Sequence, residues 1–355
     1  MSMARQLMTG GYVGSLESSI NPARYGHDGG ALAIAMESVE ELHEIFLEGY
    51  NFEQADLAAA IEGVALEGSQ YEAVAEAAIK DTFKKIKDFF VKLWNKVKAF
   101  FHEVRKYLDA IFMSGKEFAK KYEKEINKLD NIKDLTVKMF TYDDAALDSV
   151  DKVADPQAAA DDINKDVNDY ISKLEAKGLD NAGDDDIDEM KGIINELKNM
   201  EDDDIVSDLT GGKCKSADDY DEYLFGQFRN GATGQDDKDD RDLSKSDITN
   251  FVSVLTNSKA MSKFDSVQSS VDKMFSKAIK DVDTSEKKMS AIKNSKVAST
   301  TAEMLRAYSS TISKTQTMTN KGITAWKVAV KERDAAYKTA IMAAFANNRK
   351  NAKNK

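Results

Sequence analysis

The sequence contains few of the residues that form disulfides, interrupt helices or commonly bind metals, namely cysteine, proline and histidine. It contains one cysteine, Cys214, two prolines, Pro22 and Pro156, and three histidines among 355 residues. A single cysteine excludes an internal disulfide framework and favours a reducing compartment, and so few prolines permit very long helices. No run of 18 apolar residues occurs, so we expect no transmembrane helix, and the first residues lack the apolar core of a secretory signal.

The motifs of common enzyme classes are also missing. There is no HExxH, GxxxxGK[ST] or GxSxG motif, and no cysteine pair that could hold zinc. We expect His27 to lie in a flexible glycine-rich stretch and interpret His43 and His102 as surface residues on helix faces. Cys214 is interpreted as an incidental thiol, because no histidine is near it in sequence. The sequence therefore predicts a protein that is not an enzyme and binds no cofactor.

Acidic runs are abundant, but their spacing does not match a calcium loop. Residues 183–190, 201–208 and 235–242 read GDDDIDEM, EDDDIVSD and QDDKDDRD. None has the glycine and the glutamate at position twelve of an EF-hand, and Arg241 stands where a ligand is needed. We expect these runs to supply acidic residues at helix N-termini and a solvated surface, with no metal site.

Net charge changes sign three times along the chain. Residues 1–78 carry a net charge of −11, with no lysine or arginine from 25 to 79, residues 79–128 carry +7, residues 129–250 carry −20 and residues 251–355 carry +12. Such alternation is typical of separate modules that attract each other or different partners. The expected division is a flexible acidic leader over 1–70, basic amphipathic helices over 71–128, an acidic helical domain over 129–250 and long basic C-terminal helices over 251–355.

Apolar residues recur every three or four positions in most segments, which predicts helices. The fold class is therefore all-α, with long amphipathic helices that form bundles and a small acidic helical domain inserted between them. Residues 229–242 are expected to form a polar loop. The predicted helices cover 71–113, 115–128, 156–178, 184–199, 220–228 and 297–347.

The strongest pattern lies between residues 79 and 112, where the apolar spacing is close to a heptad repeat. Three interpretations fit a basic helix with a broad aromatic stripe: a bundle core or partner helix, a membrane-surface helix, and a nucleic-acid contact. The near-heptad spacing favours the bundle. The candidate interaction face consists of Phe83, Ile86, Phe90, Leu93, Trp94, Val97 and Phe101.

A short motif is repeated in the lysine-free leader. Alanine stands two residues before glutamate at Glu37, Glu62 and Glu67, and a serine or glycine follows each time. This pattern resembles the sites that prohead proteases of tailed bacteriophages cut when they remove acidic propeptides. The C-terminal phrase TAWKVAVKERDAAYKTAIMAAF is similar to internal head proteins of large tailed phages, whereas the acidic region 129–250 departs from that pattern.

The resemblance implies a non-enzymatic structural protein inside the capsid, processed by a prohead protease in the host cytoplasm or the prohead. Its implied partners are that protease, other virion proteins or further copies of itself, and DNA through the basic helices, with a membrane less favoured. Removal of 1–67 would shift the net charge from −12 to −3. The alternatives are a membrane-interacting amphipathic helical protein and a helical-bundle adaptor.

Overall fold

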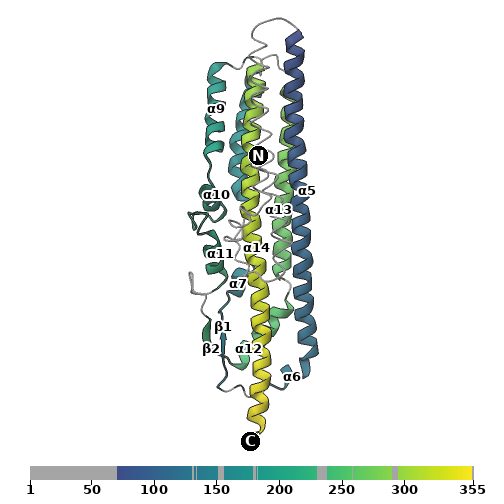
Figure 1. Ribbon diagram of the computed structural model, residues 1–355, viewed down its shortest axis with the longest axis vertical. Coiled ribbons are helices and arrows are strands. Elements are labelled where there is room, and N and C mark those ends of the chain that lie inside the picture. The colour runs from purple at the N-terminus through teal and green to yellow at the C-terminus, as the bar shows by residue number, and fades with distance from the viewer. Residues whose placement is uncertain are drawn as a thin grey trace, which may run out of the picture.

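A computed structural model shows an elongated bundle of helices (Figure 1). Helix accounts for 83% of the described residues and strand for 4%, which confirms the predicted all-α fold class. The structure describes residues 70–129, 132, 134–150, 156–178, 181, 183–229, 238–257, 259–289 and 295–353.

Three long helices run along the axis of the molecule, and shorter elements pack beside them (Figure 1). The elements are α5 (Gln70–Lys121), α6 (Glu123–Asn127), β1 (Thr136–Met139), α7 (Asp144–Leu147), α8 (Pro156–Lys177), α9 (Asp184–Asn199), α10 (Asp202–Leu209), α11 (Tyr220–Phe228), β2 (Asp239–Asp242), α12 (Lys245–Thr256), α13 (Lys259–Met289) and α14 (Ser295–Lys353).

Helices α5 and α14 run parallel in a fixed register. Arg306 donates a hydrogen bond to Thr82 at 3.2 Å, and Lys338 donates one to Ser114 at 3.1 Å. Both pairs are separated by 224 residues. Because the offset is the same at points 32 residues apart on α5, the two helices keep one relative alignment over most of the bundle.

Helix α13 runs in the opposite direction to α5. The indole of Trp94 donates to Asp272 at 3.0 Å, and Arg105 donates to Asp265 at 2.8 Å. Residue numbers rise along α5 as they fall along α13, so the pair is antiparallel. This pair forms one side of the bundle in Figure 1.

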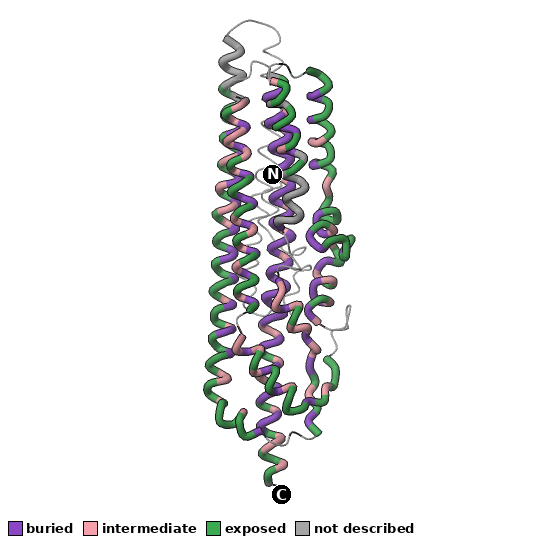
Figure 2. The backbone as a smooth tube through the Cα atoms, turned by 180° about the vertical axis from the view of Figure 1, so that it is seen from behind, coloured by how far each residue is buried: buried purple, intermediate pink, exposed green. Residues whose placement is uncertain are grey.

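Helix α14 is the central element, in contact with α5, α7, α8, α9, α10, α11, α12, α13 and β1. No residue from 297 to 334 is exposed, and Figure 2 shows buried positions along most of its length. Many of these residues are polar: Thr301, Ser309, Thr311, Ser313, Thr315, Gln316, Thr319, Asn320 and Thr324.

Threonine hydroxyls in α14 are satisfied within the helix itself. Thr319 donates to the carbonyl of Thr315 at 2.8 Å, and Thr324 donates to that of Asn320 at 2.8 Å. A buried hydroxyl is tolerated when it is hydrogen-bonded, and its methyl group still packs against neighbours. This explains how a helix with a polar sequence can be surrounded by other helices.

Helix α5 continues past the point where the sequence pattern suggested an end. We expected one helix to stop near residue 113 and another to begin at 115, but α5 runs without a break to Lys121. Gly115 lies inside it, and a Cβ added there would sit 2.4 Å from the carbonyl oxygen of Leu255 on α12. The glycine therefore permits close helix packing and does not end the helix.

The acidic segment forms α8 to α11. Helix α8 begins at Pro156 and ends before Gly178, whose positive φ of 80° terminates it. Helices α9 and α11 occupy the predicted ranges. Their apolar residues belong to the same core cluster as those of α5 and α14, so these helices pack directly on the central helix.

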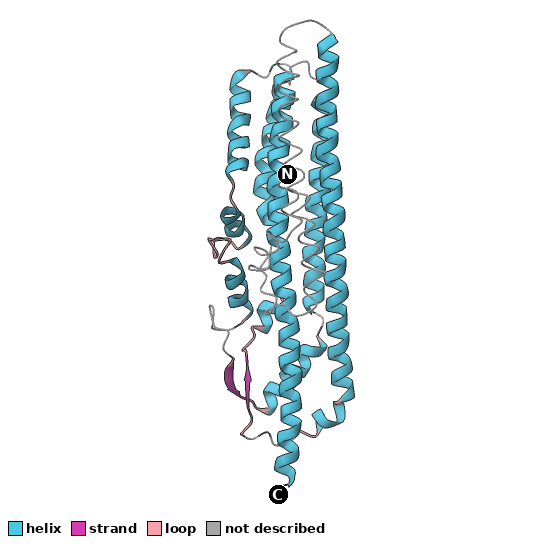
Figure 3. Cartoon of the chain, viewed as in Figure 1, coloured by secondary structure: helices cyan, strands magenta, loops and turns pink. Residues whose placement is uncertain are grey.

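A small antiparallel sheet joins two distant segments (Figure 3). β1 pairs with β2, with Thr136 opposite Asp242 and Met139 opposite Asp239. The prediction of a polar loop over 229–242 is wrong for its last four residues, which form β2. The Asp-Asp-Arg-Asp sequence has low strand propensity, so pairing with β1, which itself contacts α14, supplies the order.

Candidate functional site

The predicted interaction face on α5 lies in the core of the bundle. Six of its residues are at most 1% exposed: Phe83, Ile86, Phe90, Leu93, Val97 and Phe101. Trp94 is half-buried. The face is therefore occupied within the chain.

Aromatic contacts identify what covers this face. The ring of Phe90 lies 6.0 Å from that of Tyr308 on α14, and the ring of Phe101 lies 5.4 Å from that of Phe264 on α13. These contacts agree with the bundle interpretation, because a membrane-surface helix would need the same stripe to be open. In the described part of the chain, no helix is long and apolar enough to cross a membrane.

The opposite face of α5 is exposed and mainly basic. Lys87 and Arg105, which flank the buried stripe, pair with Asp283 and Asp265 of α13 at 2.6 and 2.8 Å. Between residues 80 and 121 the exposed acids are Asp81, Asp88, Glu103, Asp109 and Glu117. The exposed bases number ten: Lys80, Lys84, Lys85, Lys92, Lys98, Arg105, Lys106, Lys116, Lys120 and Lys121.

The three candidate cleavage residues, Glu37, Glu62 and Glu67, lie outside the described residues. So do His27 and His43, whereas His102 lies on the exposed face of α5. The structure therefore leaves the processing prediction as a prediction.

The acidic runs act at helix N-termini. The carboxylate of Asp186 accepts the backbone N–H of Gly183 at 2.9 Å, and that of Asp204 accepts the N–H of Glu201 at 2.9 Å. A hydrogen bond from Lys177, at 2.7 Å, keeps the pKa of Asp186 below its ordinary value. No group of three His, Cys, Asp or Glu side chains among the described residues could hold a metal ion.

Cys214 is buried and free. Its thiol donates to the carbonyl of Ser216 at 3.3 Å, and its backbone N–H donates to the hydroxyl of Thr210 at 3.0 Å. The residue holds the turn between α10 and α11 in place.

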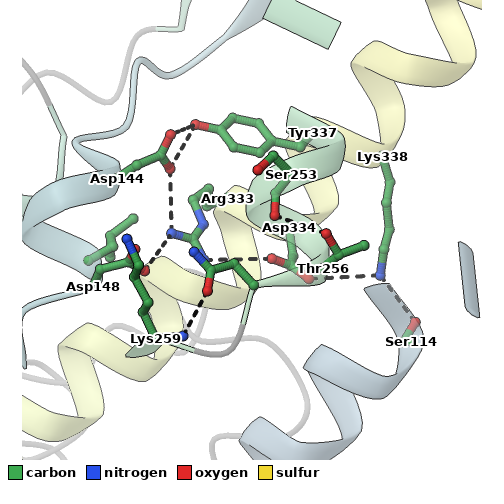
Figure 4. Close-up of polar contacts among 12 residues, drawn as sticks. Ser114, Asp144, Asp148, Ser253, Thr256, Lys259, Arg333, Asp334, Tyr337 and Lys338 are labelled. Atoms are coloured by element: carbon green, nitrogen blue, oxygen red, sulfur yellow. Dashed lines mark hydrogen bonds and ion pairs between the residues drawn. The ribbon is translucent and has the colours of Figure 1, made fainter. Parts of the chain in front are cut away.

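A cluster of charged residues lies where α7 meets α14 (Figure 4), with Arg333 and Asp334 buried and Asp144 and Asp148 partly buried. Arg333 is 1% exposed and lies 3.4 Å from Asp144 and 4.0 Å from Asp148. The hydroxyl of Tyr337 donates to the carboxylate of Asp144, with both oxygens 3.0 Å away. Burial raises the pKa of Asp144 and of Asp148, while Arg333 opposes that shift.

Asp334 is the exceptional member of the cluster. Among the described residues neither carboxylate oxygen has a hydrogen-bond partner, and Arg333 and Lys338 lie 3.9 Å away. Burial raises the pKa of Asp334 to about 6. Gly115 of α5 lies beside it, because a Cβ added there would be 3.6 Å from one carboxylate oxygen.

This arrangement can exchange a proton near neutral pH at a junction of four helices. Deprotonation of Asp334 places an unsolvated charge between α5, α12 and α14, which opposes close packing. Titration of Asp334 is therefore expected to make the free energy of unfolding depend on pH. Arg333 and Tyr337 hold the neighbouring carboxylate of Asp144 on α7 and anchor that short helix.

A second feature is a cleft of about 350 Å³ between β1 and α14. It is lined by Val137, Lys138, Met139, Phe140, Tyr142, Lys238, Glu332, Ala335, Ala336 and Thr339. Arg229 stacks over the ring of Phe140, 4.1 Å from its centroid, and pairs with Glu332 at 2.5 Å. These contacts tie the end of α11 to α14.

Our sequence reasoning missed the buried cluster, although a signal was present. The central helix reads VKERDAAY from Val330 to Tyr337, so Arg333 and Asp334 interrupt the apolar spacing. A charged pair between two apolar positions of a helix that is otherwise buried indicates buried partners elsewhere. The partners on α7 could not be identified, because 189 residues separate Arg333 from Asp144.

No protein-family model, curated protein or solved structure matches this chain. Any inference about function therefore rests on the sequence and structure of this chain.

Proposed function

We propose that this chain is a non-enzymatic structural protein, an internal head component of a large tailed phage that a prohead protease processes. The observation that supports a structural role is that the three long helices bury their apolar faces within the chain. Apolar faces of α5, α13 and α14 are buried against one another, and the exposed residues of these helices are mainly charged or polar. Such a molecule acts through its length and its surface.

The length supports a scaffold or spacer role. Helix α14 has 59 residues, which corresponds to about 88 Å at 1.5 Å per residue. It is braced along this length by parallel α5 and by several shorter helices. A braced helix resists bending, so the protein can keep two contacts far apart inside an assembly.

The location inside a virion is supported by the alanine-x-glutamate motifs and by the lysine-free acidic leader that contains them. The proposed partners are other virion proteins or further copies of the chain, the prohead protease, and DNA. Before processing the protein would be in the host cytoplasm or the prohead, and afterwards inside the capsid.

Mass spectrometry of the protein taken from its native assembly tests the processing step. We expect a mature N-terminus at Gly68 or Gly63, or less favourably at Ser38, because each follows a glutamate of the motif. Glu67→Gln should block the cut at Gly68 or move it to Gly63. Glu48→Gln is the matched control, since Glu48 lacks the alanine two residues earlier. An intact N-terminus in mature particles would contradict the processing proposal, and with it the motif that supports the virion location.

Binding to liposomes separates this proposal from the membrane alternative. The stripe that would enter a bilayer is buried, so we expect the folded protein to remain unbound to neutral phospholipid vesicles. Binding that needs Phe90 and Val97, without loss of helicity on their replacement, would favour the membrane alternative.

A further inference from the structure

The two flanks of the molecule carry opposite charge. In Figure 1, α9, α10 and α11 lie on one side of α14, and α5 lies on the other. Figure 2 shows the same separation from behind, with exposed residues on both flanks. The central helix contacts both groups and lies between them.

The acidic flank consists of residues 184–228, which contain 15 acidic and 4 basic side chains. Thirteen of the acidic side chains are exposed: Asp184, Asp185, Asp188, Glu189, Glu196, Glu201, Asp202, Asp203, Asp204, Asp208, Asp218, Asp219 and Glu222. A flank of this density repels copies of itself and attracts a cationic surface.

The basic flank is the outer face of α5, with ten exposed bases against five exposed acids between residues 80 and 121. Near the C-terminal end of α5 this face carries an apolar contact point, since Met113 is 61% exposed, the most exposed of the large apolar residues described. Lys106, Met113 and Lys120 are seven residues apart, so they follow one line along the helix. An exposed methionine among lysines suits a protein contact better than a phosphate contact.

We propose that copies of this chain associate side by side, with the outer face of α5 of one copy against the α9–α11 flank of the next. The inference rests on the proposed structural role but not on the virion location. Because the two faces differ, the contact is heterologous, and it repeats into an open row or closes into a ring. The charges fit this occupant, because each copy supplies both the basic and the acidic face.

Sedimentation velocity of the full chain tests the contact. At 25 mM NaCl we expect oligomers that grow with protein concentration, and at 500 mM NaCl we expect monomer, because exposed charges are screened by salt. Monomer at low salt up to the highest soluble concentration would overturn the proposal.

Charge reversal gives a sharper test. One variant carries Lys84→Glu, Lys92→Glu and Lys106→Glu on α5, and the other carries Glu196→Lys, Asp218→Lys and Glu222→Lys on the acidic flank. Each alone should dissociate at a lower salt concentration than the wild type, since the charge difference between the two faces is reduced: the exposed groups of α5 change from ten bases and five acids to seven and eight, and those of the acidic flank from thirteen acids and four bases to ten and seven.

Lys138→Glu, Lys238→Glu and Lys350→Glu form the control variant, which changes the net charge by the same amount away from α5. It should assemble as the wild type does, and circular dichroism should show equal helicity in all variants. If both variants assemble at the same salt concentrations as the wild type, or if large complexes form only after double-stranded DNA is added, the proposal is wrong. An uncut N-terminus in particles would contradict the processing proposal but would not affect the test of side-by-side association.

Discussion

Helices α5 and α14 run parallel through one bundle, yet they bury their residues in different ways. Helix α5 places an aromatic stripe inside and lysines outside, as an amphipathic helix at the edge of a bundle does. Helix α14 has no exposed residue from 297 to 334, although threonine, serine and amide side chains are frequent there. The comparison teaches that position in the bundle decides burial more than the polarity of the sequence does.

The difference also separates two kinds of contribution. The edge helix supplies stability through one face and remains available for partners through the other. The central helix supplies packing around most of its circumference, and its buried threonine hydroxyls donate to carbonyls of the same helix. Substitutions in matched residues of the two helices should therefore differ in size.

The largest effect is expected for the tryptophans. Trp326 of α14 is fully buried, stacks on Phe264 and donates to the carbonyl of Leu147 at 2.7 Å. Trp326→Ala should lower the free energy of unfolding by about 3–5 kcal/mol. Trp94→Ala on α5 removes a half-buried ring and should cost only about 1–2 kcal/mol. Urea denaturation measures both, and equal losses would contradict the distinction between centre and edge.

The buried carboxylate on α14 gives the next effect, and it depends on pH. The folded pKa of Asp334 is about 6, above its ordinary 3.8, so the folded state takes up a proton at a higher pH than the unfolded state. Stability from this group therefore falls as pH rises from 4 to 6, by about 3 kcal/mol in total, and stays low above that. Asp334→Asn should remove this dependence.

Urea denaturation at pH 7.5 and pH 4 tests this expectation. The Asp334→Asn variant should be more stable than wild type by about 1–3 kcal/mol at pH 7.5 and about equal to it at pH 4. A variant less stable than wild type at pH 7.5 would show that Arg333 needs this carboxylate in addition to Asp144.

Glycines in two helices extend the comparison to the backbone. Gly115→Ala on α5 places a methyl 2.4 Å from the carbonyl oxygen of Leu255, so the helices have to separate. We expect a loss of about 1–3 kcal/mol from overpacking. Gly192→Ala on α9 meets nothing within 4 Å and should gain about 1 kcal/mol from helix propensity. A gain in both variants would show that α12 can move away.

Apolar periodicity predicted the helices well where a proline or a glycine marks the helix end. Pro156 and Gly178 delimit α8, and the apolar spacing located α9 and most of α14. It failed at Gly115, since sequence alone does not distinguish a glycine that ends a helix from one that admits a neighbour. It also missed the partners of Arg333, because a contact across 189 residues leaves no local pattern.

The smallest effect concerns threonines of α14 itself. Thr319 is fully buried and Thr339 is exposed, and each hydroxyl donates to the carbonyl four residues earlier, at 2.8 and 2.9 Å. Thr319→Ala should cost about 1 kcal/mol, since the lost methyl leaves a small void. Thr339→Ala should gain about 0.5 kcal/mol, since alanine has the higher helix propensity and nothing buried is removed. Thermal unfolding of the two variants decides the matter: the same sign in both would mean that the intrahelical hydrogen bond, and not the position in the bundle, controls what a threonine contributes to α14.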